Sequence, residues 1–263
     1  MSLTPIDPGP IEGAAMDANR FDAANSEHIR WHAHKTGQFI LVESGASHLY
    51  TELGTWIIPA RRIAWVPPGV LHASKASGNG HGWVVIPPAS LAELPPRVCV
   101  LRASALLVSA LQRVTQLKAH DQLGALLWRV IAEEMRGAQP ELQEVPLPSS
   151  PRLLKAALSV LASPTAVCSL DRIANLAGMS RRSFARHFRN QTGLSFARWK
   201  RAVIAQHALE LVALGHKVSS VATDVGYESV SAFIAMFRRQ YGESPRQFLL
   251  ENSGRYLQAR QFH

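Results

Sequence analysis

One pattern occurs twice within residues 169–248. Residues 173–195 read IANLAGMSRRSFARHFRNQTGLS, and residues 221–244 read VATDVGYESVSAFIAMFRRQYGES. Each copy has a short helical segment, a glycine-containing turn, a serine suited to cap a helix, and a second helix with phenylalanines at i and i+4. The copies are offset by 49 residues from Ser180 and Ser229 onward and by 48 before them, so the second turn has one extra residue. The repeat predicts two helix-turn-helix motifs, an arrangement that can read two sites on DNA.

The charges of the chain are segregated toward this repeat. The 263-residue chain holds 28 Lys and Arg against 19 Asp and Glu. Residues 151–263 hold 16 basic and 6 acidic side chains, whereas residues 1–150 hold 12 and 13. A basic excess in one half is expected of a surface that neutralises phosphates, and a general solubilising charge would not be segregated in this way.

The first recognition helix is expected over residues 181–191, capped by Ser180. Its Phe184 and Phe188 would face the core, which leaves a row of arginines on the opposite face. Arginine binds guanine O6 and N7 with two hydrogen bonds, and neighbouring arginines can hold phosphates. The candidate DNA-contacting residues on this helix are Arg181, Arg182, Ser183, Arg186 and Arg189.

The second recognition helix is expected over residues 230–240 and differs in chemistry. With Phe233 and Phe237 inward, its outward side chains are small or apolar until the arginines near its end. Small and apolar side chains can contact thymine methyl groups, and the arginines can hold the DNA backbone. We therefore expect asymmetric readout, with the stronger base preference under the first helix. The candidate contacts here are Ser229, Val230, Ser231, Ala235, Arg238 and Arg239.

A long helix is expected between the two motifs, over residues 196–214, with Ser195 as its N-cap and Gly215 at its end. It would span roughly 28 Å, which can place the recognition helices in successive major grooves about 34 Å apart. A further helix is expected to begin at Pro151, with Ser150 as its cap.

The doubled motif resembles the AraC/XylS family of bacterial transcription regulators. The resemblance covers residues 150–250 and depends on the spacing of Gly226, Phe233, Phe237, Gly242, Ser244 and Pro245. It implies regulation of transcription by a small-molecule signal, often as a dimer, through contact with RNA polymerase. One departure is the small Ala235, where relatives often have a polar or basic residue.

The N-terminal half is expected to form a small β-barrel or jelly roll. Short strand-like runs are separated at close spacing by turns rich in Gly, Pro and Asn-Gly. The expected strands are 38–42, 47–51, 55–58, 62–66 and 82–86.

Three histidines accompany these strands. His32 and His34 form an HxH pair whose side chains would share one face, and the turn PPGVLH at residues 67–72 delivers His72. The pattern resembles the two motifs of the cupin family, in which such histidines and a carboxylate hold a metal inside the barrel. Gln38 stands where that family usually has Glu, and the Gly that normally opens the second motif is missing.

Several interpretations of this cluster stay open. Three neutral imidazoles can bind Zn, Ni, Fe or Mn, and open coordination positions would make the site a sensor or a catalyst. Without the carboxylate, the side chains of His32, His34, Gln38 and His72 can instead bind an organic effector in a preformed pocket. They can also simply satisfy one another and buried water.

Residues 103–135 change to a helical period and predict two amphipathic helices. Such a pair can cover the sheet of its own barrel or pair with a second copy of itself. Because the two apolar stripes exceed what one barrel face needs, we favour a homodimer. The predicted fold is α+β with two domains. Its segments are a mobile leader (1–20), a cupin-like sensor barrel (21–98), the helical pair (99–137), a proline-rich linker (138–149), the double helix-turn-helix domain (150–250) and a tail (251–263).

Other classes of protein are less consistent with the sequence. Two cysteines without a CxxC motif, no signal-peptide pattern and no long apolar run predict a cytoplasmic protein without a membrane segment. No nucleophile–base pair, P-loop or dinucleotide fingerprint is found, so no enzyme is expected. The leading hypothesis is a sequence-specific transcription regulator that binds double-stranded DNA and a small-molecule or metal effector. The alternatives are a cupin-type metalloenzyme fused to a DNA-binding module, supported only by the histidines, and an architectural DNA protein without a signal.

Overall fold

The computed structural model describes residues 18–22, 31–88, 91, 94–117, 121–142, 144–166 and 169–252. Its residues form two compact units. The first, called the sheet unit, comprises residues up to 51 and 56–143; the second, called the helical unit, comprises 52–55 and 144 onward. Most of the expected leader and tail lies outside the described residues. No helix in the described ranges is long and apolar enough to cross a membrane.

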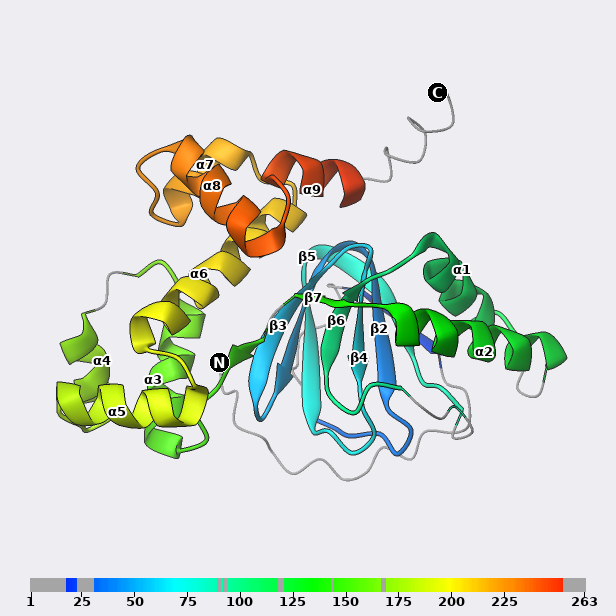
Figure 1. The fold of residues 1–263 in the computed structure, drawn as a ribbon, viewed down its shortest axis with the longest axis horizontal. Coiled ribbons are helices and arrows are strands. Elements are labelled where there is room, and N and C mark those ends of the chain that lie inside the picture. Colours follow the sequence, from blue (N-terminus) through cyan, green and yellow to red (C-terminus); the bar gives the residue numbers. More distant parts are fainter. Residues whose placement is uncertain are drawn as a thin grey trace. The chain divides into compact units, whose positions relative to one another are not determined.

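The strands form one eight-stranded sheet whose registers run antiparallel (Figure 1). Its main order is β1-β5-β2-β4-β6-β7, and β3 pairs with both β2 and β8. The strands are β1 (Ala18–Asp22), β2 (Gln38–Thr51), β3 (Gly54–Pro59), β4 (Arg62–Val66), β5 (His72–Val85), β6 (Cys99–Arg102), β7 (Pro140–Leu142) and β8 (Val145–Pro146). The predicted β-rich N-terminal half is confirmed.

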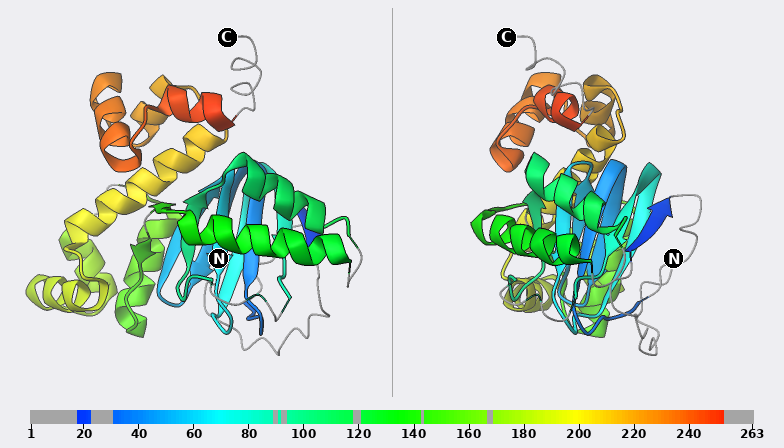
Figure 2. Two further views of the ribbon diagram at one scale, coloured as in Figure 1. Left: turned by 45° about the vertical axis from the view of Figure 1, so that its right-hand side comes forward. Right: turned by 90° about the vertical axis from the view of Figure 1, so that its right-hand side faces the viewer.

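The core of the sheet unit lies between one face of the sheet and two helices, α1 (Ala105–Val114) and α2 (Gln122–Gly137). Phe39 on β2 and Trp65 on β4 are paired across strands, and the apolar stripes of both helices pack on this face. Trp128 of α2 stacks on Phe39 with ring centroids 6.3 Å apart. Figures 1 and 2 show both helices lying across the sheet. Their apolar stripes therefore cover the sheet of their own chain.

The expected leader overlaps strand β1, and β5 begins at His72 rather than at residue 82. The structure differs from the expected strands in two further places. The expected strands 38–42 and 47–51 are one bulged strand, β2, because Gly45 adopts φ 66° and passes close to Gly80 of β5. A Cβ on Gly45 would lie 2.8 Å from the Gly80 Cα, so only glycine allows the strand to continue here. The second difference is that strands β6, β7 and β8 fall within the segments expected as helical pair and linker, so part of the linker is held by backbone hydrogen bonds.

The helical unit consists of seven described helices. They are α3 (Pro151–Ala162), α4 (Leu170–Leu176), α5 (Arg181–Thr192), α6 (Phe196–Ala213), α7 (Val218–Asp224), α8 (Val230–Tyr241) and α9 (Pro245–Asn252). Figure 1 shows α6 running from the group α3–α5 to the group α7–α9. The two predicted helix-turn-helix motifs and the long helix between them are confirmed, with bounds that agree to within a residue.

The helix ends follow from the serines and glycines of the repeat. Ser180 and Ser229 each accept a hydrogen bond from the backbone N–H three residues on, which satisfies an otherwise free donor of the first turn. Gly193 and Gly242 end α5 and α8 in the left-handed region, at φ 71° and 78°. The expected cap at Ser150 is wrong in one respect. Its hydroxyl makes no cap hydrogen bond, and its backbone N–H instead donates to Gln191 Oε1 at 3.0 Å.

Candidate DNA-reading helices and histidine cluster

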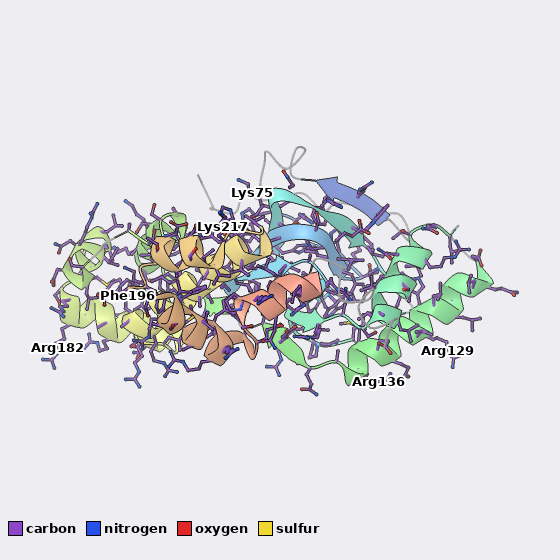
Figure 3. All side chains as sticks on the ribbon, turned by 90° about the horizontal axis from the view of Figure 1, so that it is seen from above. Lys75, Arg129, Arg136, Arg182, Phe196 and Lys217 are labelled. Carbon is purple, nitrogen blue, oxygen red and sulfur yellow. The ribbon has the colours of Figure 1, made fainter. Side chains whose placement is uncertain are left out.

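The roll of α5 is fixed by two phenylalanines. Phe184 and Phe188 are completely buried, with ring centroids 5.3 Å apart, and Phe188 packs edge-on against Trp199 of α6. Because both anchors lie on one side, the side chains of Arg182 and Arg186 are exposed on the other. Figure 3 shows Arg182 extending outward from the helical unit. The structure thus presents these two predicted residues to solvent.

Three other predicted residues of the first motif have more particular settings. Arg189 is exposed near the end of α5. Arg181 lies 3.8 Å from Asp171 of α4, an exposed ion pair that holds its guanidinium only weakly. Ser183 is half-buried, and its hydroxyl accepts a hydrogen bond from the Ser180 hydroxyl at 3.1 Å. Ser183 therefore supports the helix cap more than it offers a contact to DNA.

The second recognition helix has the same anchor and a different exposed face. Phe233 and Phe237 are completely buried, with ring centroids 5.9 Å apart. Opposite them, Ser231 and Ala235 are exposed, and Val230 is 40% exposed to solvent.

The remaining predicted residues of this motif, like some of those in the first, lie at the end of the helix or at its cap. Arg238 and Arg239 are exposed in the last turn of α8. Ser229 is exposed, but its hydroxyl accepts the cap hydrogen bond from the Ala232 backbone N–H. The repeat therefore supplies two matched helices, one presenting guanidinium groups and the other presenting methyl and hydroxyl groups until its end.

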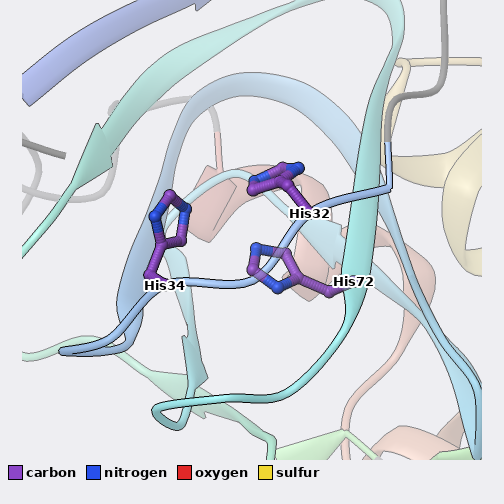
Figure 4. Close-up of side chains that lie close together, drawn as sticks. All are labelled: His32, His34 and His72. Atoms are coloured by element: carbon purple, nitrogen blue, oxygen red, sulfur yellow. The ribbon is translucent and has the colours of Figure 1, made fainter. Parts of the chain in front are cut away.

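In the sheet unit, the three predicted histidines come together (Figure 4). His32 and His72 form a two-way backbone bridge, each N–H donating to the other's carbonyl at 2.9 Å. The ring centroid of His34 lies 4.9 Å from that of His32 and 5.5 Å from that of His72. One ring nitrogen from each lies within 4.8 Å of the others, so small side-chain movements would bring all three to the roughly 2.1 Å at which imidazoles bind a shared ion.

Hydrogen bonds and burial set the protonation of this histidine cluster. His72 Nδ1 lies 2.8 Å from the Val70 carbonyl, which can only accept, so Nδ1 carries the hydrogen and Nε2 presents a lone pair. Burial lowers the pKa of His72 to about 3. Burial, followed by the charge of His32, also lowers the pKa of His34, and a hydrogen bond to Gln38 only partly opposes this. His34 and His72 are therefore neutral at physiological pH, the form in which imidazole binds metals.

The donor set fits a metal ion in three respects. His72 donates its Nδ1–H to a backbone carbonyl, as metal-bound histidines commonly do. Its Nε2 faces Gln38 Oε1 at 3.2 Å, so either the Gln38 amide presents its NH2 group there or a cation satisfies both acceptors. His34 Nε2 is buried and has no hydrogen-bond partner.

An ion-pair cluster was not foreseen from the sequence. Arg62 on β4 is buried, and its guanidinium contacts Glu141 of β7 at 2.6 and 2.9 Å. Arg102 of β6 also reaches Glu141, at 3.0 Å. The uninterrupted apolar run that follows Arg62 indicates a strand buried on both faces, so Arg62 could be expected to be buried, but only the fold identifies its partner.

Comparison with known proteins gives matches for both units. Residues 14–164 match the family profile of the AraC-like ligand binding domain, and residues 173–251 match that of a helix-turn-helix domain. The transcriptional regulator NimR of Escherichia coli is 28% identical over 221 residues, which cover 83% of this chain and 81% of NimR. The transcriptional regulator RipA of Corynebacterium glutamicum is 38% identical over 104 residues, which cover 39% of this chain and 31% of RipA.

Among solved structures, ToxT of Vibrio cholerae aligns with 90% of this chain and 98% of its own, at 12% identity and a TM-score of 0.38. The profile of the ligand binding domain alone spans more than half of the sequence. This chain therefore belongs to the AraC family, as a DNA-binding transcriptional regulator that carries an AraC-like ligand binding domain and is not an enzyme.

Proposed function

We propose that this regulator reads a bipartite double-stranded DNA site with α5 and α8, under the control of an effector bound at the histidine cluster. The observation that carries the proposal is the matched pair of phenylalanine-anchored helices whose opposite faces are exposed. The 18 residues of α6 correspond to about 27 Å, which suits recognition helices placed in neighbouring major grooves. Such a protein would work in the cytoplasm, where it meets chromosomal DNA.

The two helices are assigned different tasks. Arg182 and Arg186 contact guanine O6 and N7 and supply most of the base preference. Arg238 and Arg239 hold phosphates under the second half-site, which contributes affinity without sequence preference.

Binding-site selection from randomised duplex DNA tests this division. Arg182→Ala and Arg186→Ala should each relax the preference at particular positions by about 1–3 kcal/mol, and Arg238→Ala should weaken binding to all sequences alike. Arg129→Ala on α2 is the matched control, because Arg129 is an exposed arginine of the sheet unit (Figure 3). Stronger base preference in the half-site under α8 would contradict the proposal.

The histidine cluster is proposed to bind the signal. His32, His34 and His72 would hold a divalent metal, with Gln38 as a neutral fourth oxygen donor in place of the usual carboxylate. Such a metal, when bound, supplies open coordination positions for an effector. An organic effector held by the same side chains without a metal is the other candidate, favoured by the missing carboxylate charge.

Metal analysis of the purified protein separates these candidates. His72→Ala should abolish metal binding, whereas His48→Ala should not, because His48 stacks on Tyr50 away from the cluster. DNA affinity measured with and without Zn, Ni, Fe or Mn then shows whether the metal is the signal. An affinity that no metal and no metabolite alters would instead support an architectural DNA protein. The alternative of a fused metalloenzyme is wrong, because the chain belongs to a family of transcription regulators.

The protein partners are also proposed. Leu106, Leu123 and Leu126 remain exposed on α1 and α2 after the sheet is covered, and they offer an apolar surface for a second copy of the chain. Contact with RNA polymerase would convert DNA binding into regulation. Sedimentation of the Leu126→Glu variant tests the dimer, because a charge on that surface should shift the protein toward monomer.

A further inference from the structure

The inference concerns the exposed face of α8 and depends on the proposed function. From Ser180 and Ser229 onward, α8 matches α5 position by position: Val230 stands at the place of Arg181, Ser231 at that of Arg182, and Ala235 at that of Arg186. We propose that α8 recognises the C5-methyl group of pyrimidines in the major groove, and therefore binds thymine and 5-methylcytosine alike. Binding by this regulator would then respond to cytosine methylation within the second half-site.

The geometry of α8 supports this assignment. Phe233 and Phe237 are completely buried and set the roll of the helix. At about 3.6 residues per turn, Ser231 and Ala235 then project away from the core on successive turns. Val230 is 40% exposed and lies in the first turn, where recognition helices contact base edges. The exposed groups at these three positions are methyls and one hydroxyl.

The chemistry of this face selects for a methyl group, whatever hydrogen-bond donor or acceptor lies beside it. Thymine presents a methyl group beside an O4 acceptor, and 5-methylcytosine presents the same methyl group beside an N4 donor. Val230 and Ala235 can contact the methyl group but cannot distinguish donor from acceptor. The Ser231 hydroxyl can donate or accept, so it tolerates both bases. Unmethylated cytosine offers no methyl group and should bind about fourfold more weakly per contact.

The α5 face makes the opposite demand. Its arginines have only N–H donors, so they require the paired acceptors of guanine and gain nothing from a pyrimidine methyl group. Loss of thymine methyl groups should therefore weaken binding only under α8. Each buried methyl group contributes about a fourfold change in affinity.

The test uses the full-length protein and two selections from the same randomised duplex library, one synthesised with dTTP and one with dUTP, which lacks the methyl group. Positions under α5 are identified as those whose preference relaxes in the Arg186→Ala variant. At the remaining half-site, deoxyuridine should weaken binding about fourfold per contacted thymine. In the selected duplex, cytosine in place of such a thymine should bind weakly, and 5-methylcytosine should restore the affinity.

A variant and a control complete the experiment. Val230→Ala should reduce the penalty of deoxyuridine, because it removes part of the surface that covers the methyl group, whereas Arg182→Ala should leave that penalty unchanged. A consensus that forms equally well with dUTP, or a methyl effect confined to the α5 half-site, would overturn the inference and leave the proposed function intact. Failure to select any consensus from either library would overturn the proposed function and the inference with it.

Discussion

Helices α5 and α8 have the same caps and buried phenylalanines, but they expose different side chains. Both begin at a capping serine, bury phenylalanines four residues apart, and end at a glycine in the left-handed region. Their exposed faces differ at the matched pair Arg186 and Ala235. Burial thus fixes where a helix lies and how it is rolled, while the exposed positions remain free to vary. A duplicated motif can therefore carry two different recognition chemistries on one fold.

The largest expected effect tests whether the buried phenylalanines of α5 and α8 stabilise the protein equally. Phe188→Ala and Phe237→Ala should each lower the free energy of unfolding by about 3–5 kcal/mol, because each removes a completely buried ring and leaves a cavity. Urea unfolding followed by helical circular dichroism measures the loss. Leu250→Ala is the control, since Leu250 is an exposed hydrophobic residue of α9 and should change little. A large loss for only one of the two phenylalanines would break the equivalence.

The next effect tests whether the exposed faces account for the difference in readout. Ala235→Arg places a guanidinium at the position that matches Arg186, and it should create a preference for guanine under α8 of about 1–3 kcal/mol. Binding-site selection of this variant beside the unaltered protein measures the gain. An unaltered preference would mean that α8 does not enter the major groove as α5 does.

A smaller effect distinguishes Ser180 and Ser229, whose hydroxyls cap a helix, from Ser150, which stands at an N-cap position without a cap hydrogen bond. Ser180→Ala and Ser229→Ala should each lower the free energy of unfolding by about 1 kcal/mol, because each loses a hydrogen bond to a free backbone N–H. Ser150→Ala should cost far less, since the Ser150 hydroxyl is buried without a hydrogen-bond partner. Equal losses at all three positions, measured by thermal unfolding, would contradict this distinction.

The smallest effect concerns the arginines that stand at matched positions of the two helices. Arg189 and Arg238 occupy matched exposed positions, and each is expected to neutralise one phosphate. Arg189→Ala and Arg238→Ala should therefore each reduce the slope of log affinity against log salt concentration by about 0.9. Titrations with the selected duplex over a range of salt concentrations measure the slopes. Unequal changes would show that one of the two arginines contacts a base.

Much of the helical unit could be predicted because its signals are local. The serines, the paired phenylalanines and the terminal glycines act within one or two turns of their own helices, so the sequence indicates both the helices and their exposed faces. The sheet unit was predicted less well. Strand β2 was expected as two strands because Gly45 resembles a turn, and its continuation depends on Gly80, which lies far away in the sequence.

The histidine cluster could be predicted from the sequence only in part. The spacing of His32, His34 and His72 predicted a common site, since alternation along a strand and one turn are local properties. The neutral state of His72 depends on its burial, and the hydrogen on its Nδ1 depends on the carbonyl of Val70; both required the folded chain.

The sequence by itself determined the duplicated motif, the charge carried by its half of the chain and the residues that can face DNA. These features repeat within a few residues or sum over a segment, so no distant contact is needed to find them. Only the tertiary structure decided which side chains are partners across the sheet, such as Arg62 with Glu141, and that the stripes of α1 and α2 cover it. Such partners are chosen by strand register and packing between distant segments, which local patterns do not specify.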